Sequence, residues 1–208
     1  MKSFAAKAAL LSVLPCLCAS PLHAGDAKPL LVEAGKVVAE PDFKSRLGSE
    51  WTIKHGVWEA ADGVMTIAEL PANKHAAVLW HSAALASAVI DCEFQWDGAK
   101  VFLVGCDGAK HIGRMVITPK SAKLCEDSAE VKGKVPSHTL AEAAVDLKPG
   151  EWHKLHLEWT GDRMAARLDG TELQAQHSYL ATAKSRWWFA VGGASLKLRN
   201  VRAAEGRP

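Results

Sequence analysis

The residues of this chain that most suggest chemistry are carboxylates that alternate with apolar side chains. Between residues 88 and 97, Asp91, Glu93 and Gln95 occupy every second position. In a β-strand they would share one face, with Asp91 and Glu93 about 6.5 Å apart at the backbone. Carboxyl pairs about 5 to 9.5 Å apart are suited to cleaving glycosidic bonds. We therefore expect Glu93 to be an acid/base residue with Asp91 as its partner and Gln95 as a ligand contact; an ordinary solvated face is the alternative.

A second polar cluster surrounds a proline in residues 69–75. It contains the carboxylate of Glu69, the amine of Lys74 and the imidazole of His75, and loops beside a sheet often carry binding groups. The apolar residues that follow predict that His75 is drawn inward, where its pKa would shift. We expect His75 to be a second possible partner of Glu93, with Glu69 and Lys74 on the rim of a ligand site. A polar loop without a function is the alternative.

His111 and Arg114 lie in a segment whose apolar neighbours predict burial on both faces. An arginine in such a place needs an acidic partner, because an unpaired buried charge is costly. Glu93, across the sheet, is the partner that we expect. Alternatively, Arg114 orients an anionic or keto oxygen of a ligand, with His111 beside it.

The chain has eight tryptophans and a single tyrosine. Trp80 and the Trp187–Trp188 pair are candidates for an exposed platform under a sugar ring. Adjacent residues of a strand face opposite sides, so only one member of the pair can face the core. The remaining tryptophans occupy strand positions and are expected to fill the core: Trp51, Trp58, Trp96, Trp152 and Trp159.

Short alternating segments separated by turn signals dominate the chain from Phe43 onward. Asp-Gly pairs typical of tight turns occur at the ends of four of them: Asp62, Asp97, Asp107 and Asp169. This regular spacing predicts a single all-β sandwich. Residues 121–146 are more polar, and we expect a long surface excursion there, with a helical turn at residues 139–144.

Four short motifs carry a family resemblance: Trp51-x4-Gly56-x-Trp58-x3-Asp62-Gly63, Asp91-x-Glu93-Phe94, Trp152-His153 with Asp169-Gly170, and Leu198-Arg199-Asn200-Val201. With them the chain resembles the concanavalin A-like lectin and glucanase sandwiches. Within these it looks most like the 3-keto-disaccharide hydrolase domain, a glycoside-hydrolase-family-16-like group, over residues 43–203.

This resemblance implies a jelly roll of two antiparallel sheets with a saccharide on the concave sheet face. It also implies hydrolysis or elimination of a glycosidic bond. Glu93, Asp91 and His75 are then the catalytic candidates, and the substrate-binding candidates are Glu69, Lys74, Gln95, His111, Arg114 and Trp80. A non-catalytic carbohydrate-binding module and a structural envelope protein of the same fold are the alternatives.

Residues 1–24 have the features of an export signal, in which Lys2 and Lys7 precede an apolar stretch too short to span a membrane. We expect a leader over residues 25–42 and one domain over residues 43–205 of a secreted or periplasmic protein. Without the two signal lysines, 25 basic residues become 23 and balance the 23 acidic ones. The charge therefore gives no indication of a nucleic-acid partner.

Three cysteines remain once Cys16 and Cys18 leave with the signal, so at most one internal disulfide is expected. Cys106 with Cys125 is the pair that we expect by position, and Cys92 is expected to be a buried apolar side chain. No histidine or cysteine spacing fits a zinc site. Related sandwiches often carry a structural calcium ion, but the Asp-Gly pairs are explained as turns, so we expect no metal and no cofactor.

Overall fold

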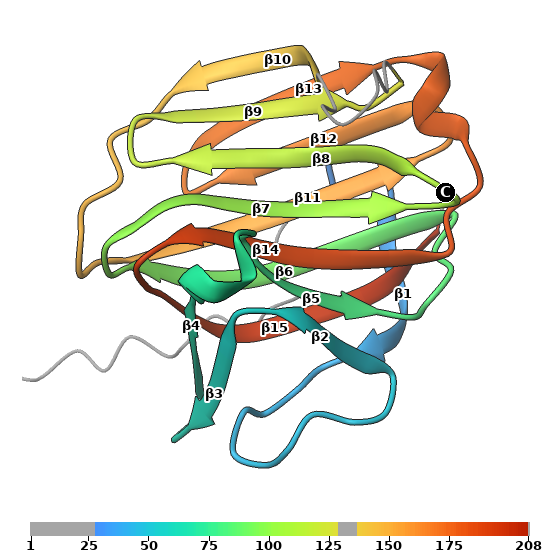
Figure 1. Ribbon diagram of the computed structural model, residues 1–208. Helices are drawn as coiled ribbons and strands as arrows, with labels where there is room; N and C mark the ends of the chain where they lie inside the picture. Colours follow the sequence, from blue (N-terminus) through green and yellow to red (C-terminus); the bar gives the residue numbers. More distant parts are fainter. Residues whose placement is uncertain (1–27, 129–136, 208) are drawn as a thin grey trace, which may run out of the picture.

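The computed structural model describes residues 28–128 and 137–207, which form two antiparallel sheets packed face to face (Figure 1). The expected export signal lies outside the described residues. In the eight-stranded sheet the order is β13-β12-β11-β6-β15-β4-β3, and β1 pairs with β15. Its strands are β1 (Glu33–Ala39), β3 (Val57–Ala61), β4 (Val64–Ala68), β6 (Ser87–Trp96), β11 (Trp152–Thr160), β12 (Arg163–Leu168), β13 (Thr171–Gln176) and β15 (Leu196–Arg207).

The seven-stranded sheet lies in front in Figure 1 and has the order β10-β9-β8-β7-β14-β5-β2. The described helices are two short 3-10 turns, η1 (Pro71–Asn73) and η2 (Ser178–Ala181), neither of which is long enough to cross a membrane. The strands of this sheet are β2 (Trp51–His55), β5 (Ala77–His81), β7 (Ala99–Asp107), β8 (His111–Thr118), β9 (Ser121–Glu126), β10 (His138–Ala144) and β14 (Arg186–Gly193).

The predicted all-β sandwich of two antiparallel sheets is confirmed, but two local expectations need correction. Part of the expected leader forms β1, which adds a strand to the sheet beside β15. The expected surface excursion with a helical turn is wrong, because β9 and β10 pair along an edge of the seven-stranded sheet. Lys123 and Glu142, which pair with each other on these strands, are solvated, and they disguise the alternation in the sequence.

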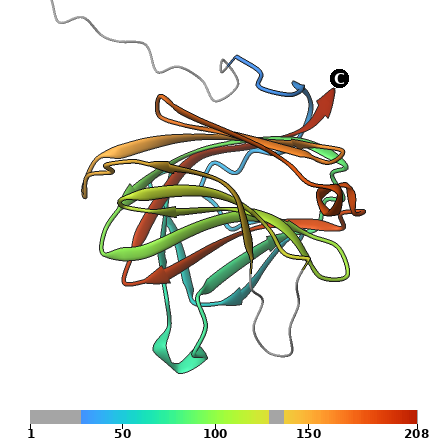
Figure 2. The ribbon, with the colours of Figure 1, turned by 90° about the horizontal axis from the view of Figure 1, so that it is seen from above.

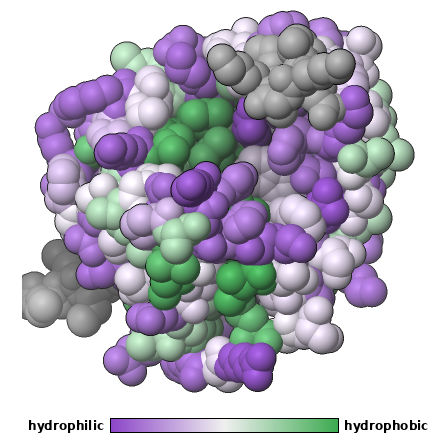
Figure 3. Space-filling view, viewed as in Figure 1, coloured by the Kyte–Doolittle hydropathy of each residue, from purple (hydrophilic) through white to green (hydrophobic). Residues whose placement is uncertain are grey.

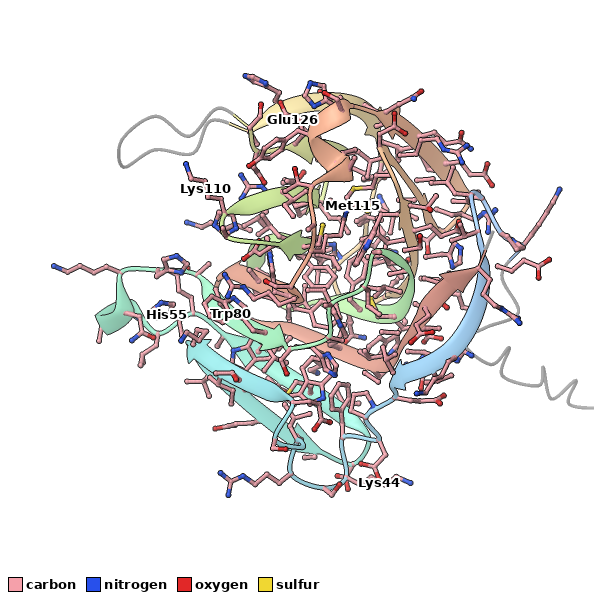
Figure 4. The ribbon with its side chains drawn as sticks, turned by 90° about the vertical axis from the view of Figure 1, so that its right-hand side faces the viewer. Lys44, His55, Trp80, Lys110, Met115 and Glu126 are labelled. Carbon is pink, nitrogen blue, oxygen red and sulfur yellow. The ribbon has the colours of Figure 1, made fainter. Side chains whose placement is uncertain are left out.

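Figure 2 shows the two layers from above. Apolar side chains from both sheets meet in one core between them. Phe94 of β6 and Phe102 of β7 join the two sheets, with ring centroids 5.0 Å apart. Figure 4 shows Met115 of β8 in this interior, where it is fully buried. Each inward residue alternates with an outward one, so every central strand also presents side chains to an outer face.

A buried ionic cluster fastens the first described residues to the eight-stranded sheet. His156 of β11 contacts two carboxylates: its Nδ1 lies 2.6 Å from Asp91 Oδ1, and its Nε2 lies 2.6 Å from Glu158 Oε1. Glu158 also accepts hydrogen bonds from the backbone N–H groups of residues 30–32. Burial alone would lower the pKa of His156, but the two carboxylates outweigh it and raise that pKa to about 9.

This cluster predicts a loss of stability at alkaline pH. Because the pKa of His156 in the folded protein lies above its ordinary value of 6.5, the cluster stabilises fully below that pH and less as the pH rises through about 9. The free energy of unfolding, measured by urea titration, should fall by roughly 3 kcal/mol between about pH 6 and about pH 9.5. Asp91→Asn removes one of the carboxylates and should show a smaller fall; an equal fall in both proteins would contradict this account.

Candidate functional site

One row of paired residues crosses the outer face of the seven-stranded sheet. Trp80 of β5 lies opposite Trp188 of β14. Gly105 of β7 pairs with Trp188 on one side and with Arg114 of β8 on the other. Opposed residues of an antiparallel ladder project to the same face, and Trp188 belongs to a small outer apolar cluster apart from the core. The row therefore places two indoles and a guanidinium on one surface, while Trp187 faces the core, as predicted for this pair.

Gly105 leaves room for the indole of Trp188 to lie across β7. A Cβ atom at position 105 would come within 2.4 Å of that ring. Trp188 is consequently only 4% exposed, although it points away from the core. Its Nε1 donates a hydrogen bond of 2.7 Å to Asp107 Oδ1, so the ring is fixed as part of the floor of this face.

The carboxylate of Asp107, at the end of β7, collects donors from three side chains. Besides the indole of Trp188, His111 Nδ1 lies 2.8 Å from Oδ1 and Arg186 Nε lies 3.2 Å from Oδ2. Asp107 is only 1% exposed, and these bonds compensate its burial. The hydrogen bond to Asp107 raises the pKa of His111, against the opposing effect of partial burial. His111 is therefore biased toward its cationic form at the surface.

A second buried carboxylate, Asp127, directly follows the end of β9. Its Oδ1 lies 2.8 Å from Arg114 Nη2, and its side chain is fully buried. Burial raises the pKa of the Asp127 carboxyl, and the charge of Arg114 only partly opposes this. Among residues 28–128 and 137–207, neither oxygen of Asp127 nor Arg114 Nε makes a directional hydrogen bond. These three atoms are buried, but the Arg114 side chain is 16% exposed, so part of its guanidinium remains open to a ligand in the groove.

Trp80 holds two cations over its indole. The guanidinium carbon of Arg186 lies 4.0 Å from the ring centroid, and Lys54 Nζ lies 4.5 Å from it. The face of an aromatic ring attracts cations in this way. Trp80 was expected to be a bare platform under a sugar. It is instead a half-buried indole flanked by positive charge.

These residues line two adjoining cavities that share Trp80 and His111, and we refer to the two together as the groove. The first, of about 330 Å³, includes Arg114, Lys54 and His55 in its lining. The second, of about 300 Å³, is lined by both buried carboxylates, Lys110 and Arg186. Figure 4 shows His55, Trp80 and Lys110 along this outer face. Figure 3 looks onto the same face, where apolar surface is surrounded by polar side chains.

Three of the expected site residues lie on the other sheet. Asp91, Glu93 and Gln95 project from the outer face of β6 in the eight-stranded sheet, away from the groove. Asp91 is held by His156, and Gln95 Nε2 donates to the Gly150 carbonyl. The expected pairing of Glu93 with Arg114 is wrong: Glu93 Oε2 lies 2.7 Å from Nη2 of Arg199. The alternation correctly predicted that these side chains share one face of a strand. It did not indicate which of the two sheets carries the groove.

The 69–75 cluster is divided. His75 lines the groove and packs its ring on His55, with centroids 4.6 Å apart, but it is exposed rather than drawn inward. Glu69 instead accepts a hydrogen bond of 2.7 Å from the backbone N–H of Gly193. Lys74 is exposed and directly follows η1 as its C-terminal cap. Of the remaining candidates, the groove gathers His111, Arg114 and Trp80.

Sequence reasoning missed several groove residues, among them two carboxylates and two cations. Asp107 carries a turn signal in the sequence, and Asp127 lies in the segment that was expected to be an excursion. Lys54 and Arg186 have no local motif, because only the pairing of β2, β5 and β14 brings them to Trp80. A period-two count along β7 would have indicated that Asp107 and Gly105 share an outer face.

The expected disulfide is wrong. Cys92, Cys106 and Cys125 are free and buried, and burial raises the pKa of each thiol. Cys106 belongs to the core, whereas Cys125 pairs with Arg114 on the outer face, so the sheet separates the two sulfur atoms. Within the described part of the chain, no group of three or more His, Cys, Asp or Glu side chains is arranged to hold a metal ion.

Two arginine–tryptophan contacts occupy opposite outer faces of the sandwich. Trp152 of β11 was expected in the core but is half-buried, with the Arg199 guanidinium carbon 3.9 Å from its ring centroid. It therefore matches Trp80 in chemistry but lies on the eight-stranded sheet. A larger cavity of about 850 Å³ adjoins Trp51 near the loop at residues 44–49, and its lining contains no carboxylate or imidazole.

Removing the charge of Asp107 should destabilise the protein. Asp107→Asn keeps the shape but weakens the bonds to His111 and Arg186, and we expect a loss of about 2 kcal/mol in the free energy of unfolding. Asp169 offers a matched control, since it bonds to His153 but is 45% exposed, and Asp169→Asn should cost less than about 1 kcal/mol. Urea titrations at neutral pH measure both; equal losses would show that Asp107 is not a special anchor.

No protein-family model and no curated protein sequence matches the chain. Solved structures do share its fold. The carbohydrate binding module CBM66 from Bacillus subtilis aligns with a TM-score of 0.61 and 15% identity, over 75% of this chain and 96% of that one. SCLam, a non-specific endo-beta-1,3(4)-glucanase from family GH16, aligns with a TM-score of 0.62 and 12% identity, over 89% and 97%. A galectin-like protein of unknown function from Bacillus subtilis gives 0.61 and 10%, over 86% and 100%. These likenesses confirm the concanavalin A-like jelly-roll fold.

Proposed function

We propose that this protein binds a saccharide in the groove on the outer face of the seven-stranded sheet. The observation that carries the proposal is the junction of the indoles of Trp80 and Trp188 with the partly exposed guanidinium of Arg114, which Asp127 holds in place. Sugars present apolar C–H faces together with hydroxyl groups, and such a junction offers a surface for each. The carbohydrate binding module and the glucanase with this fold support the choice of ligand class.

Export completes the proposal. The lysine-flanked apolar stretch of residues 1–24 is the sequence feature that supports a secreted or periplasmic location. In such a location the protein would meet polymeric or released glycans rather than cytosolic sugars.

The two arginine–tryptophan contacts provide a test of the binding face. Trp80→Ala removes the indole shared by both cavities and should weaken saccharide binding at least tenfold, or about 1.4 kcal/mol. Trp152→Ala removes the equivalent indole from the opposite face and should leave affinity unchanged. Isothermal titration with oligosaccharides measures both, and a larger loss in Trp152→Ala would place the ligand on the wrong sheet for this proposal.

Cleavage of the bound saccharide is the second candidate function. It is favoured by one observation: burial raises the pKa of Asp127, which lies with His111 in the smaller cavity. A carboxyl group with a raised pKa is better suited than an ordinary aspartate to donate a proton to a leaving oxygen. Asp127 would be the acid and His111 its partner, in hydrolysis or in elimination from a 3-keto-glycoside.

Cleavage is tested by product analysis after incubation with ordinary and 3-keto disaccharides. Asp127→Asn, checked for folding by circular dichroism, should reduce turnover at least 100-fold, since general acid catalysis contributes about that much or more. Glu93→Gln should retain turnover, because Glu93 lies on the other sheet. The opposite pattern would restore the assignment suggested by the sequence alone, and saturable binding without turnover would leave a binding module.

A further inference from the structure

Positive charge at the groove exceeds the negative charge that faces it. The groove-lining carboxylates are Asp107 and Asp127, and both are buried and engaged, the first by Arg186 and His111 and the second by Arg114. Lys54 is exposed, and in residues 28–128 and 137–207 it makes no ion pair; its recorded contact is with the ring of Trp80. The exposed charge at Trp80 is therefore cationic.

The stacking on Trp80 leaves hydrogen-bond donors available. A cation held over an aromatic face uses its π-facing side, while its N–H groups can still point elsewhere. Of the Arg186 donors, only Nε makes a hydrogen bond to a described residue. Lys54 lines the larger cavity, Arg186 lines the smaller one, and Trp80 lines both. The indole thus acts as a support that presents two cations to the two halves of the groove.

Neighbouring imidazoles add further hydrogen-bonding nitrogen atoms to the groove. His55 and His75 stack on each other beside Lys54 in the larger cavity. His111, whose pKa is raised by Asp107, adds a third imidazole where the cavities join. Anionic oxygens accept charge-assisted hydrogen bonds from Lys54 and Arg186, and such bonds are stronger than those that the neutral hydroxyl groups of a sugar accept.

We infer that the saccharide bound in the groove is anionic, with a carboxylate or sulfate group placed beside Trp80 between Lys54 and Arg186. This inference rests on the proposed function and specifies its substrate class. The apolar floor contacts the sugar ring, while the cations select the acidic substituent. Arg186 can serve Asp107 and the ligand at once, because its Nη groups lie outside the bond to Asp107.

The test compares matched ligands by isothermal titration with the folded protein. The panel pairs 1,4-linked oligomers of galacturonate, glucuronate and mannuronate with their neutral counterparts, and a sulfated galactan with its desulfated form. At least one anionic ligand should bind ten times more tightly than its neutral partner, and its affinity should fall as salt increases. The uronate and sulfate arms distinguish the two sources of negative charge.

A pair of lysine variants locates the charge recognition. Lys54→Gln should weaken anionic binding at least fivefold and lower the ratio of anionic to neutral affinity. Lys123→Gln is the control, because Lys123 is on the same sheet but is paired with Glu142 at 3.0 Å, and it should bind like the parent. Equal affinity for both members of every pair, or an unaffected Lys54→Gln, would overturn the inference while saccharide binding stands. Absence of binding to every saccharide would overturn the proposed function itself.

Discussion

The buried carboxylate of Asp107 is the interaction on which the groove depends. A charge that is 1% exposed needs strong compensation, and three side chains from the two strands β8 and β14 supply it. These side chains are Trp188, His111 and Arg186. The hydrogen bonds to Asp107 therefore fix the indole in the floor of the groove, the imidazole where its two cavities join, and one of its cations. Arg186 in turn lies on Trp80, so the restraint reaches the indole that both cavities share. A polar network whose central carboxylate has all its hydrogen bonds satisfied restrains the side chains around it. Such restraint can preorganise a binding surface.

The two sheets divide the ionic chemistry of the molecule. On the eight-stranded sheet, opposite charges are paired within the His156 cluster and within the Glu93–Arg199 pair, and both sets of contacts hold the structure together. On the seven-stranded sheet, Asp107 and Asp127 lie buried while basic groups remain at the surface. The faces therefore differ in which partner of each ion pair is exposed, since the numbers of acidic and basic residues are nearly equal overall.

The fold was predictable because it depends on local signals. Period-two alternation and Asp-Gly turns define hairpins directly: Asp62 and Asp169 adopt φ of 51°, the left-handed conformation that such turns need. The site was predictable only in part. Trp80, His111 and Arg114 were expected as ligand contacts because aromatic or charged residues stand out in apolar strands. The structure brings them together in the groove, and their role there stays a prediction. Asp107 and Asp127 were missed, and Asp91 and Glu93 were favoured, because the sequence shows which residues share a strand face but not which sheet carries the groove. That choice is made by the pairing of β14 with β5 and β7, from which it is distant in the chain.

The central claim is that ligands bind on the outer face of the seven-stranded sheet. It is tested most directly by two-dimensional NMR of isotopically labelled protein during titration with a bound saccharide, which reports every backbone amide and each tryptophan indole N–H at once. This account predicts that the perturbed signals cluster on β5, β7, β8 and β14 and include the indoles of Trp80 and Trp188. Perturbations confined to β6, β11 and β15, around Glu93 and Trp152, would contradict it.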